Sequence, residues 1–248
     1  MKAAVIRFPG SNCDQDCYHA LHDVFGVETH YVWHKETSVE AFDLIVLPGG
    51  FSYGDYLRCG AIARFSPVMQ SVIAEAEKGK LVLGICNGFQ ILCEARLLPG
   101  ALIRNESLHF ICQHRLVRLE NMHTPFTHAE VTRTDGSHLT ARTGALLNIP
   151  VAHGEGNYTA DAQTLHDLNR NGQIALRYVD ERGNASAAAN ANGSAENIAG
   201  IVNRRGNVFG LMPHPERACD PLLGSEDGKL IFQSAIESLG VKTRAKAA

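Results

Sequence analysis

The sequence contains no apolar run long enough to cross a membrane. Its first apolar segment, residues 3–8, ends at Pro9-Gly10 and is too short for a secretory signal, so we expect a first core strand there. An excess of one charge is also missing, because 23 Lys and Arg stand against 26 Asp and Glu, a net charge of −3. This balance argues against nucleic acid or an anionic membrane surface as the main partner.

Patterns typical of metal and nucleotide sites are absent as well. Cys13 and Cys17 are spaced C-x3-C, but no second Cys or His pair accompanies them, so no metal site is predicted. Seven cysteines, an odd number without a signal segment, predict reduced thiols and a cytoplasmic protein. No Gly-Lys-Ser/Thr follows a glycine loop, which disfavours a P-loop enzyme.

Short apolar strands alternate with helical patterns in the first part of the chain. Strands are predicted at about 3–8, 28–33, 44–47 and 80–83, and helices at about 14–25, 60–79 and 87–94. Continuous apolar strands separated by helices are typical of a parallel sheet that is covered on both faces. We therefore expect an α/β fold with a mostly parallel sheet.

The later part of the chain changes character. It predicts short strands near 115–120, 145–151 and 174–178, an exposed loop at 184–197, a hairpin at 198–212 and a last helix at about 225–239. We interpret these strands as an antiparallel extension of the main sheet. Residues 1–240 are predicted to form one domain and the basic residues 241–248 a frayed tail, while residues 110–148 receive no functional assignment.

A cysteine stands between two glycines where a strand turns into a helix. The segment Gly84-Ile85-Cys86-Asn87-Gly88 copies the G-x-S-x-G pattern of a nucleophile elbow. Small residues at both ends allow the strand and helix to pass close together. A thiol at a helix N-terminus is biased toward the thiolate. The alternative is a structural cysteine buried between a core strand and a core helix.

Three loops that each follow an apolar strand carry glycine: residues 9–12, 48–53 and 86–88. Sites in parallel sheets form beyond the carboxyl ends of the strands. We therefore expect these loops to converge and Cys86 to face a site.

A cysteine nucleophile needs a base and a group that orients the base, and His214 and Glu216 are the best pair available. Pro215 biases His214 toward extended geometry, in which residues two apart project to the same face. An exposed proline-rich turn with solvated charges is the alternative.

The oxyanion formed by thiolate attack needs N–H donors. Asn87 can supply one, and Gly50 of Pro48-Gly49-Gly50 the other, although that segment could equally be an ordinary tight turn. Gln90 lies one helical turn beyond Cys86 and points either toward the pocket or toward the surface. These residues together predict acyl transfer through a covalent thioester, on an amide or an ester.

The motifs resemble the three signatures of class I, triad-type glutamine amidotransferases: GICNGFQIL at 84–92, PGGFSYGD at 48–55 and PHPER at 213–217. Further segments narrow the resemblance to the glutaminase subunits of phosphoribosylformylglycinamidine synthases: PGSNCD at 9–14, YLRCGAIAR at 56–64 and PVAHGEGN at 150–157, with 192–194 and 198–200. The resemblance covers nearly the whole chain. It implies a doubly wound, flavodoxin-like α/β fold.

The resemblance also implies roles for individual residues. Cys86 would attack the side-chain amide of L-glutamine, His214 would protonate the leaving ammonia and then activate water, and Glu216 would orient His214. The oxyanion hole would comprise Gly50 and Asn87, and the glutamine-binding positions would be Gly49, Gln90, His153 and Gly154. Residues 153–156 would lie near the pocket or the ammonia exit, with an ordinary polar loop as the alternative.

No metal and no cofactor are implied for this chain. Ammonia would pass to a separate large synthase subunit, which uses ATP and Mg to convert formylglycinamide ribonucleotide to the amidine in purine biosynthesis. A small accessory subunit is implied as a further partner.

Two other functions compete with this interpretation. One is a stand-alone hydrolase or peptidase that shares the elbow, but such enzymes usually lack this placement of His214 and Glu216. The other is a binding module that holds a phosphate at a helix N-terminus after residues 9–12. A binding module gives Cys86, His214 and Glu216 no purpose.

Overall fold

The structure is a computed structural model, and it describes residues 1–241. The tail predicted at 241–248 lies outside the described residues, apart from Val241. The helices and strands are β1 (Lys2–Arg7), α1 (Asp14–His19), β2 (Glu28–Trp33), β3 (Leu44–Leu47), α2 (Pro67–Glu77), β4 (Leu81–Ile85), α3 (Asn87–Glu94), β5 (Ala101–Ile103), β6 (Ile111–Leu119), β7 (Glu130–Thr132), β8 (His138–Thr140), β9 (Leu146–His153), β10 (Asn157–Thr159), α4 (Ala162–Arg170), β11 (Ile174–Tyr178), β12 (Ile198–Val202), β13 (Val208–Leu211) and α5 (Lys229–Ser238).

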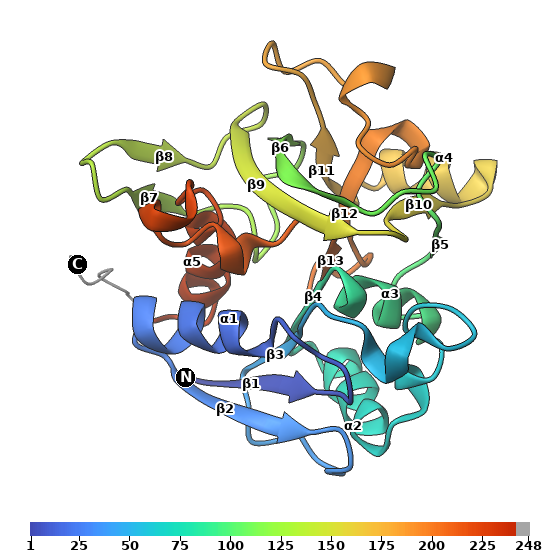
Figure 1. The fold of residues 1–248 in the computed structure, drawn as a ribbon. Coiled ribbons are helices and arrows are strands. Elements are labelled where there is room, and N and C mark those ends of the chain that lie inside the picture. Colours follow the sequence, from blue (N-terminus) through green and yellow to red (C-terminus); the bar gives the residue numbers. More distant parts are fainter. Residues whose placement is uncertain (242–248) are drawn as a thin grey trace.

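The main sheet has nine strands in the order β2-β1-β3-β4-β13-β12-β11-β6-β9. The first five of these pair in parallel. Figure 1 shows α1 and α5 on one side of the parallel strands and α2 and α3 on the other. Every residue of β3 and β4 is buried, as their unbroken apolar sequence requires of strands covered on both faces. The architecture is the doubly wound α/β fold expected from the sequence.

The antiparallel extension is present too. β12 and β13 form the predicted hairpin, and β11, β6 and β9 add antiparallel strands beyond it. The segment 110–148, which had no assigned role, supplies β6, the small β7–β8 pair and the start of β9. In the part of the chain that the structure describes, no helix is both long and apolar enough to span a bilayer.

Several predicted segments differ from the structure: α4 lies where no helix was predicted, and α5 begins at Lys229 rather than near residue 225. The helix expected at 60–79 begins only at Pro67, because proline lacks an N–H and is accommodated at the first helical position. The loop expected to be exposed at 184–197 buries Asn192 and Asn197. Asn192 Nδ2 donates to the Gly156 carbonyl at 2.7 Å, so polar composition here reflects buried hydrogen bonds rather than solvent.

Candidate active site

Cys86 occupies the sharp turn between β4 and α3. Its backbone has φ 50° and ψ −104°, a conformation that non-glycine residues rarely adopt and that costs about 1–3 kcal/mol. The Cys86 N–H donates to the Leu211 carbonyl at 2.8 Å, and the thiol lies 3.7 Å from the Ala152 carbonyl on β9. A strained turn held between two strands places the sulfur beyond the sheet edge, as the elbow pattern predicts.

The two glycines of the elbow are required by close backbone contact. A Cβ at Gly88 would lie 1.9 Å from the Leu47 carbonyl oxygen, and one at Gly84 would lie 2.7 Å from the Gly88 carbonyl oxygen. No side chain fits at either position without a shift of the backbone. The predicted reason for small residues in this motif, the close passage of strand and helix, therefore matches the structure.

His214 and Glu216 form a direct pair. His214 Nδ1 and Glu216 Oε1 are 2.6 Å apart, and both residues are about 2% exposed. The contact expected from an extended segment is made by a different local geometry, because Pro215–Arg217 form a turn of 3-10 helix. His214 itself has φ −103° and ψ 85°, outside the helical region that a following proline disfavours.

The charge on this pair depends on its neighbours. Burial disfavours the imidazolium, but the charge of Glu216 and the nearby Cys86 sulfur outweigh burial and raise the pKa of His214 well above its usual range. His214 Nε2 is buried and makes no hydrogen bond to the described residues, so its free edge is open to a reacting group. An imidazolium held by Glu216 and close to Cys86 stabilises a thiolate.

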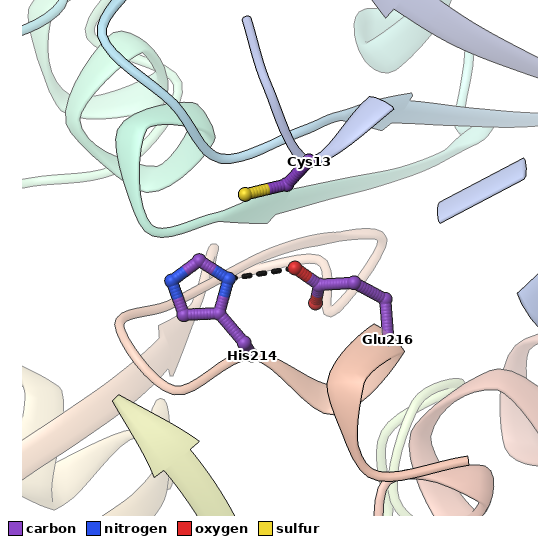
Figure 2. Close-up of side chains that lie close together, drawn as sticks. All are labelled: Cys13, His214 and Glu216. Carbon is purple, nitrogen blue, oxygen red and sulfur yellow. Dashed lines mark hydrogen bonds and ion pairs between the residues drawn. The ribbon is translucent and has the colours of Figure 1, made fainter. Parts of the chain in front are cut away.

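A second cysteine borders the same imidazole. Figure 2 shows the Cys13 thiol beside the imidazole ring that Glu216 holds. Cys13, His214 and Glu216 each have one atom that could bind a metal ion, and these three atoms lie within 4.8 Å of one another. A metal ion could be held at that spacing, but Arg217 Nη2 donates to Cys13 Sγ at 3.1 Å and its charge disfavours a cation. Burial raises the pKa of the Cys13 thiol, which keeps it neutral and a poor nucleophile.

Gly49 and Gly50 occupy the loop that follows β3. A Cβ at Gly49 would lie 2.8 Å from His214 Cε1 and 3.0 Å from Cys13 Sγ, so this position packs against the imidazole. Gly50 has φ 137° and lies against the backbone of Ser11 and Asn12. Because both positions lack a side chain, the loop can approach His214 on one side and the pocket on the other.

Asn87 is the first residue of α3, so its N–H has no carbonyl within the helix to bond. Its side chain is used locally: Oδ1 accepts from the Ser52 N–H at 3.2 Å, and Nδ2 donates to Gln90 Oε1 at 2.9 Å. Gln90 Nε2 in turn donates to the Glu155 carbonyl at 2.6 Å. Gln90 is therefore buried at the pocket rather than at the surface, which decides between the two orientations considered from sequence.

A pocket of about 320 Å³ opens above the elbow. Its walls come from the loops after β3 and β4 and from the end of β9 and the segments next to it. The lining residues are Gly50, Phe51, Asp55, Cys59, Cys86, Gln90, Arg104, Leu108, Phe110, Ala152, His153, Gly154 and Glu155. The predicted residues Gly50, Cys86, Gln90, His153 and Gly154 are thus brought to one cavity of small-ligand size.

His153, a residue of the pocket wall, has a buried ring nitrogen without a hydrogen-bond partner among the described residues. Asn105 Nδ2 donates to the carbonyls of His109 and His153, both at 2.9 Å, which fixes Asn105 Oδ1 as the acceptor for His153 Nδ1 at 3.1 Å. The proton therefore sits on Nδ1, and the buried Nε2 is a lone pair without a protein partner among the described residues. Burial, followed by the charge of His214, lowers the pKa of His153 to about 3.

Replacing His153 with glutamine is expected to weaken the pH dependence of stability. The unfolded imidazole titrates near 6.5 and the folded one near 3, so between these values the unfolded state binds one more proton. As the pH is lowered through this window, the free energy of unfolding of the wild type should fall by up to about 1.4 kcal/mol per unit more than that of His153→Gln. Urea unfolding at about pH 6 and pH 5 measures this, and equal slopes would contradict a buried neutral imidazole.

Some pocket residues were not identified from sequence as site residues. Asp55, Cys59 and Glu155 lie together at the wall, where burial raises the pKa of both the Asp55 carboxyl and the Cys59 thiol. Asn105, which orients His153, was missed as well. Asp55 and Glu155 lie within segments that resemble the family, so only the role was overlooked; nothing in the sequence around Asn105 marks it.

Comparison with known proteins identifies the family. A model of the CobB/CobQ-like glutamine amidotransferase domain matches residues 1–235. The chain belongs to the glutamine amidotransferase family. Phosphoribosylformylglycinamidine synthase subunit PurQ of Salinibacter ruber is 54% identical over 237 residues, which cover 96% of this chain and 96% of that protein. The subunit of the same name in Acaryochloris marina is 54% identical over 239 residues, which cover 96% of this chain and 97% of that protein.

Two solved structures superpose on this chain and share its fold. A chain of PurLQS from Thermotoga maritima superposes with a TM-score of 0.81 at 45% identity, covering 96% of this chain and 98% of that one. A second glutamine amidotransferase from Thermotoga maritima shares the fold with a TM-score of 0.51, at 16% identity and with 98% and 86% of the two chains covered. The α/β fold expected for this family is confirmed.

Proposed function

We propose that this chain is the glutaminase subunit of a phosphoribosylformylglycinamidine synthase. It would hydrolyse L-glutamine to glutamate and ammonia, and a synthase subunit would use that ammonia to form the amidine in purine biosynthesis. The observation that carries the proposal is the convergence of Cys86 on a strained elbow with the buried His214–Glu216 pair. This arrangement suits acyl transfer through a thioester.

The proposed reaction runs in two steps. The Cys86 sulfur attacks the side-chain amide carbon of glutamine, the C–N bond breaks, and His214 gives its proton to the leaving ammonia. His214 then takes a proton from a water molecule, which attacks the thioester and releases glutamate and the Cys86 sulfur. Glu216 holds His214 Nδ1 throughout, so that Nε2 stays directed at the reacting atoms.

The remaining predicted residues take supporting roles in this proposal. The N–H groups of Gly50 and Asn87 would stabilise the oxyanion, since both sit on backbone close to Cys86. Gln90, His153 and Gly154 would contact glutamine from the pocket wall. Gly49 would act through His214, against which it packs, rather than through the substrate. Asp55, Glu155 and Arg104, whose Nε lies 3.8 Å from Glu155 Oε1, supply charges of both signs that complement the ammonium and carboxylate of a free amino acid.

Neither a cofactor nor a metal has a part in these steps. The partner subunit would bind ATP and Mg, because this chain has no nucleotide-binding motif of the P-loop type. The PurLQS relative is by its name a complex, and we extend that organisation to this chain, with a large synthase subunit plus a small accessory subunit. We place the complex in the cytoplasm, consistent with seven free cysteines in the described residues.

A glutamate-release assay with and without the synthase subunit tests this function. We expect weak release by the isolated chain, stimulation by the synthase, and amidine only when synthase and ATP are both present. Amidine formation by the pure chain with ATP would overturn the division of labour. Hydrolysis of other amides at equal rates, with no response to the synthase, would identify a stand-alone hydrolase instead.

A further inference from the structure

Large apolar side chains are exposed around the mouth of the pocket. Phe51, Tyr56, Leu57, Leu108 and Phe110 are all exposed, and Leu57 is 91% exposed. We call these five residues the apolar rim. Exposed apolar residues that stand alone need no explanation, whereas a contiguous exposed patch marks an interaction site.

The rim residues belong to the two segments that border the pocket. Phe51, Leu108 and Phe110 line it directly, and the rings of Phe51 and Phe110 are 6.5 Å apart, which joins the two segments. Tyr56 and Leu57 lie between Asp55 and Cys59, which also line the pocket. Three rim residues therefore line the pocket itself, and the other two are carried by a segment that also lines it.

The segment that carries Tyr56 and Leu57 is held firmly from its inner side. The Tyr53 hydroxyl bonds His34 Nδ1 at 2.7 Å and Ser66 Oγ at 2.9 Å, and Arg58 Nη2 donates to Glu94 Oε2 at 2.8 Å. Gly60 packs so closely on α3 that a Cβ would lie 2.8 Å from the Ile91 nitrogen. These contacts fix the backbone while leaving the apolar side chains in solvent.

Two rim residues also hold an unfavourable backbone conformation. Leu57 has φ 70° and Leu108 has φ 59°, in the left-handed region where bulky residues are rare. Strain of this kind costs about 1–3 kcal/mol per residue and persists where function requires it. Glycine or asparagine would relieve it, and both leucines are exposed, so packing within this chain does not account for these side chains.

We propose that the apolar rim is the docking surface for the ammonia-consuming synthase subunit, an inference that rests on the proposed function. Ammonia that escapes to water is protonated and lost as a nucleophile, so the acceptor has to lie against the pocket, which the rim borders. A second copy of this chain fits poorly, because pairing rim to rim would close two pockets on each other and leave no acceptor. Exposed apolar and aromatic side chains on a preformed backbone are the usual centres of such interfaces.

The test compares two equally exposed leucines. Leu57→Asp places a charge in the rim, whereas Leu222→Asp does so at a residue that is 92% exposed and outside it. We expect Leu57→Asp to weaken binding to the purified synthase subunit by about tenfold or more, as measured by titration calorimetry, and Leu222→Asp to change it less than twofold. Neither leucine lines the pocket, so glutamate release by the isolated chain should be unchanged in both.

A second variant keeps the proposal testable if the charge disturbs folding. Leu57→Gly removes the side chain and relieves the positive φ, so it should raise the thermal midpoint of the isolated chain and still weaken synthase binding. Wild-type affinity in both Leu57 variants, or equal weakening by Leu222→Asp, would overturn the docking surface. Self-association of the wild type that Leu57→Asp abolishes would assign the rim to a second copy.

The failure of the docking proposal is separable from that of the function. If the wild-type chain and the synthase together release no glutamate, the proposed function is wrong whatever the affinities. If glutamate and amidine form normally and Leu57→Asp binds like the wild type, only the docking surface is wrong.

Discussion

Replacing Cys86 with alanine is expected to lower the rate of glutamate release from glutamine by a factor of about 10⁴ or more. Without the sulfur no thioester forms, and the His214–Glu216 pair has no nucleophile to activate. The proposed oxyanion N–H groups and the pocket remain, so a small residual rate from substrate binding alone is the most that can survive. The measurement is glutamate production by the variant together with the synthase subunit.

Cys93→Ala provides the matched control. Cys93 lies on the same helix as the elbow, is likewise buried, and contacts the Pro99 carbonyl rather than the pocket. It should keep nearly full activity and lose at most a modest amount of stability. If Cys86→Ala released glutamate at the wild-type rate, or if both alanine variants were equally inactive, the assignment of the nucleophile would fail.

Gly88→Ala is the second substitution for which we expect a large effect, here on folding. The added methyl group would sit 1.9 Å from the Leu47 carbonyl oxygen and 2.7 Å from its carbonyl carbon, which are backbone atoms that cannot move aside as a flexible side chain could. The strand β3 and the helix α3 would have to separate, at a cost of about 3 kcal/mol or more, and the elbow would open. Urea unfolding followed by circular dichroism measures the loss.

Gly154→Ala is the control for that comparison, since the nearest atom to an added Cβ at Gly154 is 3.7 Å away and its φ lies outside the left-handed region. Its free energy of unfolding should stay within about 0.5 kcal/mol of the wild type. A Gly88→Ala variant as stable as Gly154→Ala would show that the close passage of β3 and α3 is not required.

Local features of the site were predictable from sequence because short-range physics determines them. The apolar runs at β1, β3 and β4 specify buried parallel strands, and the spacing of Gly84, Cys86 and Gly88 specifies the elbow. The pairing of His214 with Glu216 followed from their separation by one proline. Even there the predicted backbone geometry was wrong, because a 3-10 turn rather than an extended strand brings the two side chains together.

Other features depend on contacts between distant segments, which sequence patterns do not show. His153 is held by Asn105, 48 residues earlier, and the wall that faces Cys86 comes from β9, 66 residues later. Asn192 is buried because the Gly156 carbonyl accepts its hydrogen bond, although its own segment is polar throughout. Tertiary packing determines these contacts and the burial of these side chains, and no periodicity or motif in the sequence indicates them.

The central claim is that glutamine is converted through a thioester on Cys86. His214→Asn removes the base that activates water, so any thioester that forms in this variant should persist and accumulate. The most direct test uses that variant in complex with the synthase subunit, mixed with glutamine and quenched in acid. Mass spectrometry of its proteolytic peptides then shows which peptide carries the adduct. The account predicts a γ-glutamyl group on the peptide that contains Cys86, whereas an adduct on Cys13, or glutamate release with no adduct on any cysteine, would contradict it.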